Sequence, residues 1–290
     1  MKKKTDLKKL EKRRKRVRGI GIRLLLLLLF AAMAYGANNR IEVSEYTYET
    51  AELSFSFDGF RIVQLSDLHN KIFPKNNETL LREVRALEPD LIVLTGDIVD
   101  GKTHTDIPAA LLFMEQIAKI APAYYVTGNH EHGVQQDLLA QYLEQTEARG
   151  VKLLDNEAVQ ISAESGQTFT LIGMDDNSLQ ANMLKTLADD AKDDFQVLLA
   201  HEPQYLKTSY AESGVDLVFS GHAHGGQFRI PLLHQGIWSP DQGFFPKMTE
   251  GSFTEGDTTM YVSRGLGNSA FPLRLCNHPE IVSVTLRVVK

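Results

Sequence analysis

The sequence predicts a mixed α/β domain that follows an N-terminal segment for membrane targeting. Short runs rich in β-forming residues alternate with amphipathic helical patterns from residue 40 onward. We find no internal repeat, low-complexity tract or linker after residue 40, so this body is one domain. Hydrophobic residues at 43% and charged residues at 23% are ordinary globular values, which excludes a disordered or fibrous chain.

The N-terminal segment combines a basic run with an apolar run. Residues 1–23 hold twelve Lys or Arg and two acidic residues, and residues 24–37 are apolar. This pattern is typical of a signal peptide, with Ala32-Met33-Ala34 as its cleavage site, or of a retained anchor. We favour the anchor, with residues 1–23 as a cytoplasmic tail and the body outside the cytoplasm, because basic flanks stay inside. Residues 38–57 are interpreted as a lead-in segment.

The body opens with three strands and three helices in alternation. Strands are predicted at 60–65, 91–94 and 124–126, because each is a short apolar run bounded by polar or turn-forming residues. The helices begin near Asn77, at 107 with Pro108 in the first turn, and at 135. They end before Pro89, near 119 and at Gly150.

The second half of the body is richer in strands. Its predicted strands are 151–154, 158–162, 168–172, 196–200, 215–219, 259–263 and 280–288. Helices are expected near 181–192 and after Pro203. Residues 231–256 form a long connection that holds Trp238, Phe244 and Phe245. Such a loop could line a cleft, lean on a bilayer or pack on the body.

Charge and cysteine content exclude several classes of function. Residues 24–290 hold 19 basic and 35 acidic residues, a net charge of −16. Nucleic acid is therefore not an expected partner, because Lys and Arg must neutralise its phosphates. The single cysteine, Cys276, excludes an internal disulfide and a thiolate metal cluster. Nothing in the sequence indicates an obligate protein partner.

Polar side chains with metal-binding chemistry follow five of the predicted strands. In open α/β sheets, ligands gather beyond the carboxyl ends of the strands. Each residue alone could cap a helix or fill a turn, but five of the nine histidines fall in these short stretches. The candidate metal ligands are Asp67, His69, Asp97, Asn129, His201, His222 and His224. Gly96, Gly128 and Gly221 each precede a candidate, where the lack of a Cβ permits a sharp turn and close approach.

These stretches resemble the calcineurin-like metallophosphoesterases. The chain carries D-x-H at 67–69, G-D-x-x-D at 96–100, G-N-H-E at 128–131, the strand-terminal His201 and G-H-x-H at 221–224. Residues 224–227 and 263–267 are similar to the exported or membrane-anchored bacterial branch. The resemblance implies two face-to-face mixed β-sheets flanked by helices, a four-layer sandwich, over residues 58–290.

The resemblance also implies a binuclear metal centre. Asp67, His69 and His224 would bind one metal ion, Asn129, His201 and His222 the other, and Asp97 would bridge them. Two divalent ions would attract the ester phosphate and acidify a shared water, so that a bridging hydroxide serves as nucleophile. The mixed nitrogen and oxygen ligands suit Mn, Fe or Zn better than Ca or Mg.

Two residues outside the ligand set are candidates for proton transfer. His130 follows Asn129 and is the candidate general acid, and Asp100 is expected to orient it by analogy with the family. Gly101 stands where the protein Ser/Thr phosphatases carry Arg, which argues against a phosphoprotein substrate. Arg264 and Asn268 are candidate phosphate contacts on branch resemblance alone. The remaining histidines are interpreted as surface or structural residues: His104, His132, His234 and His278.

We therefore expect an extracytoplasmic hydrolase of phosphate mono- or diesters, acting on a small molecule or on a lipid-linked phosphate or pyrophosphate. A nucleotide or cyclic-nucleotide phosphodiesterase is the alternative among enzymes. A metal-dependent binding or sensory ectodomain without turnover is the alternative of another class. The proton donor His130 favours an enzyme, since a binding module has no use for one.

Overall fold

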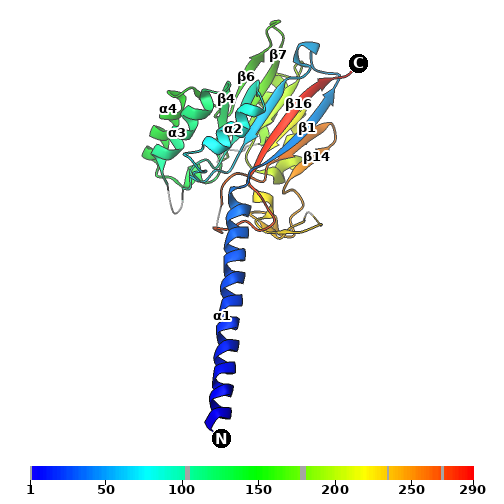
Figure 1. Cartoon of the computed structure of the whole chain (residues 1–290). Helices are drawn as coiled ribbons and strands as arrows, with labels where there is room; N and C mark the ends of the chain where they lie inside the picture. The colour runs from blue at the N-terminus through cyan, green and yellow to red at the C-terminus, as the bar shows by residue number, and fades with distance from the viewer. Residues whose placement is uncertain (1, 102–104, 177–180, 234, 269–270) are drawn as a thin grey trace.

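The computed structural model describes every residue except 1, 102–104, 177–180, 234 and 269–270. A long helix, α1 (Lys2–Asn39), projects from a body built of strands and shorter helices (Figure 1). Within α1, Lys12–Asn39 is long and apolar enough to cross a membrane, and most of this stretch is exposed. The body begins at Glu42, and only two residues separate it from the end of α1.

The body contains two six-stranded sheets, each mixed in direction. The order in the first sheet is β1 (Glu42–Thr50), β16 (Glu280–Val288), β2 (Arg61–Leu65), β3 (Leu91–Thr95), β4 (Ala123–Val126) and β5 (Val151–Leu153). The order in the second is β14 (Gly251–Glu255), β15 (Thr258–Val262), β9 (Leu217–Ser220), β8 (Gln196–Leu199), β7 (Thr168–Gly173) and β6 (Glu157–Ser162). The central strands β2 to β5 are parallel to one another, as are β7, β8, β9 and β15.

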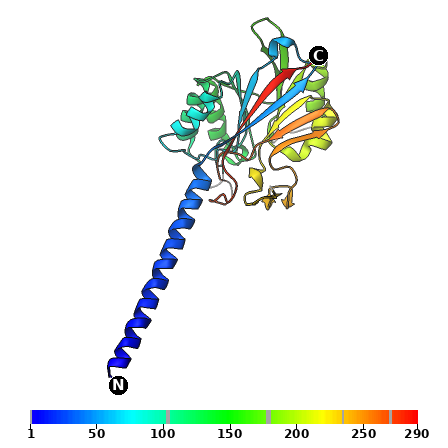
Figure 2. The same ribbon diagram turned by 45° about the vertical axis from the view of Figure 1, so that its right-hand side comes forward.

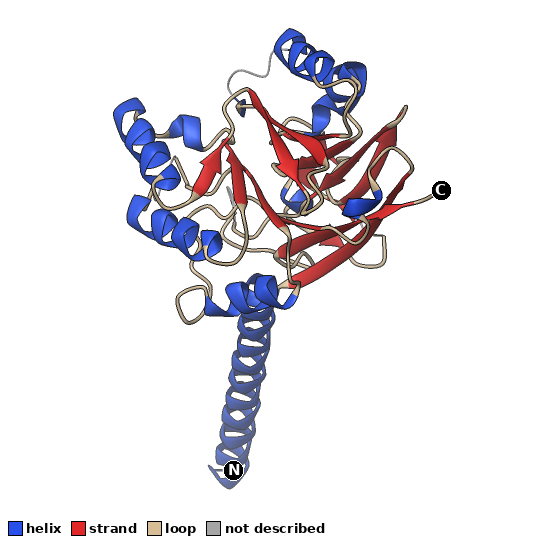
Figure 3. Ribbon diagram, turned by 90° about the horizontal axis from the view of Figure 1, so that it is seen from above, coloured by secondary structure: helices blue, strands red, loops and turns tan. Residues whose placement is uncertain are grey.

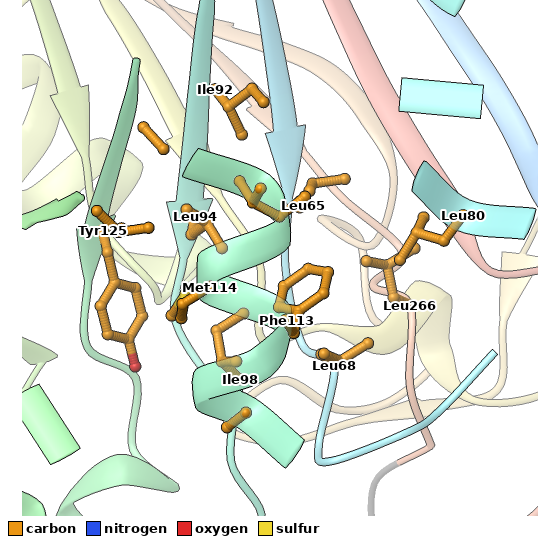
Figure 4. Packing of buried hydrophobic residues seen from close by; sticks show 14 of the residues in the cluster. Leu65, Leu68, Leu80, Ile92, Leu94, Ile98, Phe113, Met114, Tyr125 and Leu266 are labelled. Atoms are coloured by element: carbon orange, nitrogen blue, oxygen red, sulfur yellow. The ribbon is translucent and has the colours of Figure 1, made fainter. Parts of the chain in front are cut away.

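Helices cover the outer face of each sheet, which gives four layers (Figure 3). The first sheet packs against α2 (Glu78–Ala86), α3 (Ile107–Ala118) and α4 (Gln136–Glu147). Figure 4 shows Phe113 and Met114 of α3 over Leu65 and Leu94 of the sheet. The second sheet is covered by α5 (Ala181–Asp190) and by the helical turns that end in α6 (Ala211–Ser213). The expected two-sheet sandwich is confirmed.

The inner faces of the two sheets form a second apolar core. Val93 and Val284 of the first sheet share this cluster with Phe169, Leu199 and Phe219 of the second. Residues of β3, β8 and β9 are buried along their whole length, since these strands are covered on both faces. A strand that is buried on both faces consists of a continuous apolar run, and the sequence therefore predicts the positions of these strands closely.

Two segments differ from the sequence-based prediction. Residues 42–50, interpreted as part of a lead-in segment, are the edge strand β1, paired in parallel with β16. The first sheet therefore includes residues 42–50, which precede the predicted boundary at 58. The long connection 231–256 contains β11 (Gln235–Gly236), β12 (Trp238–Ser239), β13 (Gly243–Phe244) and β14, and β11 pairs with β10 (Arg229–Ile230) just before it.

The direction of the strands decides where the site lies. β1 starts beside the end of α1 and runs away from it, and β16 is parallel to β1. β2 is antiparallel to β16, and β3 and β4 are parallel to β2. The carboxyl ends of β2, β3 and β4 therefore lie at the end of the body from which α1 leaves (Figures 1 and 2).

Candidate metal centre

The structure brings all seven candidate ligands together at this end of the body. The stretch after β2 supplies two of them, those after β3, β4 and β8 supply one each, and the stretch after β9 supplies two. All except Asn129, which is half-buried, are buried. Their side-chain nitrogen and oxygen atoms form two adjoining groups.

The first group consists of Asp67, His69 and His224 with Asp97. The two imidazole Nε2 atoms lie 3.1 Å apart. His224 Nε2 is 3.3 Å from Asp67 Oδ1, and His69 Nε2 is 3.5 Å from Asp97 Oδ2. Several ligand atoms thus converge on one small volume, as expected of a cation site.

The second group consists of Asn129, His201 and His222, again with Asp97. His222 Nδ1 lies 3.1 Å from Asn129 Oδ1 and 3.2 Å from His201 Nε2. His201 Nε2 is 3.3 Å from Asp97 Oδ2. One oxygen atom, Oδ2 of Asp97, therefore faces a histidine of each group. A carboxylate in this position can bridge two metal ions.

Partners on the far side of the rings fix two of the histidines for metal binding. His201 Nδ1 donates a hydrogen bond to the Thr95 carbonyl oxygen at 2.7 Å. His222 Nε2 lies 2.8 Å from Asp241 Oδ2 and donates to it. Each ring thereby turns its other nitrogen toward the cluster, the arrangement by which outer partners orient metal-binding histidines.

Burial keeps three of the histidines neutral, which is the form that binds metals. Desolvation lowers the pKa of His69 to about 4 and that of His222 to about 4. It also lowers the pKa of His224 well below its usual value. Burial and then the nearby Asp97 carboxylate raise the pKa of Asp67 to about 7. A cation in the cluster would reverse this rise, since it stabilises the carboxylate. The cluster therefore fits two divalent ions.

The backbone at the cluster adopts conformations that are uncommon for residues with a side chain. Asp67, His69, Asp97, His222 and His224 all have positive φ, between 47° and 66°. Such outliers gather at functional sites, where surrounding contacts hold them. The stretches after β2 and β3 are joined by hydrogen bonds from Asp67 N to Gly96 O at 3.0 Å and from His69 N to Asp97 O at 2.9 Å.

Glycine is required where these stretches meet. A Cβ atom on Gly221 would lie 2.4 Å from Asp67 Oδ2, and one on Gly128 would lie 2.4 Å from Asp97 Oδ1. Both distances are shorter than van der Waals contact. The prediction that these glycines permit close approach is therefore confirmed.

Glu131 is a positioning residue that the sequence analysis missed. Its buried carboxylate accepts hydrogen bonds from the backbone N–H groups of Asp97, Ile98, Val99 and Gly128, at 2.7–3.1 Å. It thereby locks the stretch after β3 against the stretch after β4. Its place at the end of the G-N-H-E stretch is its signal in the sequence, but these four backbone donors could not be foreseen from it.

His130 and Asp100, the candidates for proton transfer, lie beside the first group. The His130 ring meets the His69 ring edge-on, with 4.4 Å between ring centres. His130 Nδ1 lies 3.3 Å from Asp100 Oδ1, and the His130 backbone N–H donates to Asp97 Oδ1 at 2.8 Å. Asp100 can therefore hold the His130 ring next to the metal ligands.

The two candidate phosphate contacts, Arg264 and Asn268, interact with other groups of the protein. Arg264 is almost buried and forms ion pairs with Glu42, Glu250 and Glu280. Asn268 Nδ2 donates to the Pro272 carbonyl oxygen at 3.1 Å. These contacts connect both residues to the protein itself, and their role toward a substrate stays a prediction.

The other histidines stand outside the cluster where the structure describes them. His132 Nε2 lies 2.7 Å from Asp175 Oδ1, and both residues line a cavity of about 230 Å³ beside α4. His278 Nε2 is 3.8 Å from Glu42. His104 and His234 lie outside the described residues.

Residues 60–226 match the model of the calcineurin-like phosphoesterase family, which is more than half of the chain. The chain belongs to this family. It is 33% identical over 255 residues to an uncharacterized metallophosphoesterase of Bacillus subtilis, YkuE, covering 85% of this chain and 86% of the relative. It is 30% identical over 231 residues to the phosphodiesterase YaeI of Escherichia coli, covering 78% and 82%.

Among solved structures, the Thermus thermophilus sulfate thiohydrolase SoxB, in complex with glycerol, has the same fold. The TM-score is 0.52 at 12% identity, over 80% of this chain and 57% of that one. This calcineurin-like chain is thus a metallophosphoesterase, a hydrolase of phosphoester bonds. Family membership and the clustered His and Asp side chains together fit a binuclear divalent metal centre.

Proposed function

We propose that the chain hydrolyses phosphate mono- or diesters outside the cytoplasm, at a membrane, with two divalent ions of Mn, Fe or Zn. Asp67, His69 and His224 hold one ion, and Asn129, His201 and His222 hold the other. The single observation that supports this assignment is the position of Asp97 Oδ2 within 3.5 Å of His69 Nε2 and 3.3 Å of His201 Nε2. A purely structural metal site would not need one carboxylate oxygen placed between two groups of ligands.

The protein supplies binding, orientation and a proton. Bound divalent ions would neutralise the ester phosphate and activate water at neutral pH. Within a body of net charge −16, the metal centre is then the place that attracts a phosphate. His130, oriented by Asp100, gives its proton to the oxygen of the leaving alcohol, which would otherwise depart as a strongly basic alkoxide.

Retention of α1 as an anchor is supported by how it ends. Ala34, Ala37 and Asn38 are buried against the body. Lys71 Nζ donates to the Asn38 carbonyl oxygen, and the Arg274 backbone N–H donates to Asn38 Oδ1 at 3.2 Å. Cleavage after Ala34 would leave Ala37 and Asn38 in the mature chain, so among these residues it is the burial of Ala34 that favours an uncleaved helix. The basic residues 1–23 would then remain in the cytoplasm, and the metal centre would be extracytoplasmic.

The substrate that suits an anchored phosphoesterase is a lipid-linked phosphate or pyrophosphate, which lies in the same membrane. A nucleotide or cyclic nucleotide is the second candidate, and the description of the relative YaeI as a phosphodiesterase supports a diester.

The test of this function is the dependence on the leaving group. We expect His130→Ala to lower turnover of alkyl phosphates by roughly 10²–10⁴-fold, the usual range for general acid catalysis. Turnover of p-nitrophenyl phosphate should fall much less, because p-nitrophenolate leaves without a proton. The assays use the full chain in detergent with added Mn²⁺, and metal content is measured for each variant.

Asp100→Asn is the matched control and should give a milder loss with the same pattern. Equal losses for good and poor leaving groups would contradict the role of His130 as general acid. Absence of hydrolysis by the unsubstituted, metal-loaded chain, on mono- and diesters alike, would contradict the proposed function itself.

A further inference from the structure

Large apolar side chains stand exposed near β11, β12 and β13, on the part of the chain that also supplies Asp241 to His222. Leu232 is 95% exposed, Leu233 70%, Phe244 75% and Phe245 62%. Single exposed apolar residues are normal on protein surfaces, but several on neighbouring loops indicate a surface that meets a partner. We name these four residues the apolar rim.

The backbone of the apolar rim is held in unusual conformations. Leu232 has φ of 70° and Phe245 has φ of 54°, values that bulky side chains rarely adopt. Phe245 N donates to the Ile237 carbonyl oxygen at 2.9 Å, and β12 pairs with β13 in a short hairpin. The rim is thus part of an ordered structure that holds apolar side chains outward, at a cost in strain.

The rim and α1 lie at the same end of the molecule. The segment 227–246, gold in Figures 1 and 2, lies beside the point where α1 leaves the body. The carboxyl ends of β2, β3 and β4, which carry metal ligands, lie at this end too. A membrane crossed by α1 would therefore face both the rim and the metal centre.

The short apolar run of α1 and its contacts with the body keep the body close to the membrane. The apolar run 24–37 spans about 21 Å at roughly 1.5 Å per residue, less than the ~30 Å core of a bilayer. For the whole run to lie in the bilayer, the helix must be buried in it up to its last turn, which contacts the body. Lys71 Nζ, which holds the end of α1, also donates to the Leu266 carbonyl oxygen at 2.9 Å. The body then touches the lipid surface.

We propose that the apolar rim inserts into the lipid bilayer that α1 crosses, so that the metal centre faces the membrane surface. The proposal rests on the anchor in the proposed function. The partner is the bilayer interface itself, in which exposed Leu and Phe side chains gain the free energy of apolar burial. A phosphate ester on a membrane amphiphile could then reach the metal centre without leaving the leaflet.

Depth-dependent fluorescence quenching tests the insertion. Trp238 is the only tryptophan in the sequence, so Trp238→Phe removes the native tryptophan emission. In that variant, Phe244→Trp places a single tryptophan in the rim. The matched control is Phe55→Trp in the same background. Phe55 is 72% exposed and belongs to η1 (Phe55–Phe57), which packs near the far end of β16. Both variants are made in the full chain and reconstituted in phosphatidylcholine vesicles with and without brominated phosphatidylcholine.

We expect at least about a twofold loss of Phe244→Trp emission in brominated vesicles, since interfacial side chains reach roughly 5–10 Å below the headgroups. Emission of Phe55→Trp should not change. Equal emission of Phe244→Trp in both vesicles, while the chain resists carbonate extraction, would overturn the rim proposal and leave the anchor intact. Release of the chain by carbonate would overturn the anchor and the rim together. Neither result depends on catalysis, so hydrolysis in detergent tests the enzyme separately.

Discussion

Replacing Arg264 with methionine removes a guanidinium that three carboxylates share. Arg264 Nη2 lies 2.9 Å from Glu42 Oε2 and 3.1 Å from Glu280 Oε1, and Arg264 Nε lies 3.3 Å from Glu250 Oε2. Glu42 opens β1, Glu280 opens β16, and Glu250 precedes β14 of the other sheet. The arginine therefore joins the two sheets at the end of the body that carries the metal centre.

The expected loss of stability follows from burial. The Glu280 side chain is 2% exposed and that of Arg264 is 10% exposed. Without the guanidinium, Glu280 keeps hydrogen bonds from the Ser44 hydroxyl and from the backbone N–H of residue 264 at 2.8 Å, but loses its ion pair with Arg264. Removing one partner of a buried ion pair costs about 3–5 kcal/mol. That is a large share of the roughly 5–15 kcal/mol that stabilises a typical protein.

The free energy of unfolding is measured by urea denaturation of the full chain in detergent, followed by circular dichroism. Arg287→Met is the matched control, because Arg287 pairs with Asp58 at 3.3 Å but its side chain is 51% exposed. An exposed pair contributes about 0–1 kcal/mol. A loss below about 1 kcal/mol for Arg264→Met, together with a raised KM for phosphate esters, would refute the structural role and favour the predicted contact with substrate.

Two further predictions concern the metal centre. Asp97→Asn should lower the occupancy of both metal ions, and His224→Ala mainly that of one, as read by metal analysis of the full chain; loss of a single ion in Asp97→Asn would argue against a bridging oxygen. Gly221→Ala places a Cβ 2.0 Å from Ser66 Oγ and 2.4 Å from Asp67 Oδ2, so we expect lower metal content and a loss of about 1–3 kcal/mol in stability. Gly36→Ala, where a Cβ meets nothing within 4 Å, is its control, and equal effects of the two substitutions would contradict the steric argument.

The sequence predicts the strands that carry the site better than the strands at the edges. β3 and β9 are covered on both faces, so their residues form short apolar runs that stand out. β1 alternates between half-buried and exposed residues and lies at the edge of its sheet, where polar side chains are tolerated. Its pairing partner β16 is more than 200 residues away in the chain, and no local pattern reveals that contact.

Some side-chain roles are also predictable from the sequence, and others are not. The clustering of the candidate metal ligands is predictable, because each lies at a strand end and carries recognisable chemistry. Glu131 accepts hydrogen bonds from four backbone N–H groups, and backbone donors carry no signature in the sequence. Arg264 is recognisable as a cation, but its three carboxylates come from distant segments, and only the folded chain shows that they surround it.

The left-handed backbone at the ligands has a consequence for metal exchange. Each such residue costs about 1–2 kcal/mol relative to ordinary backbone, and five of the seven ligands adopt it. Hydrogen bonds such as His222 N to Asp67 Oδ1 at 3.0 Å hold these conformations through the protein's own groups. The distortion is thus imposed when the chain folds rather than when an ion arrives. One divalent ion could replace another with little reorganisation of the loops, and the availability of ions in the surroundings would then decide which metals the site carries.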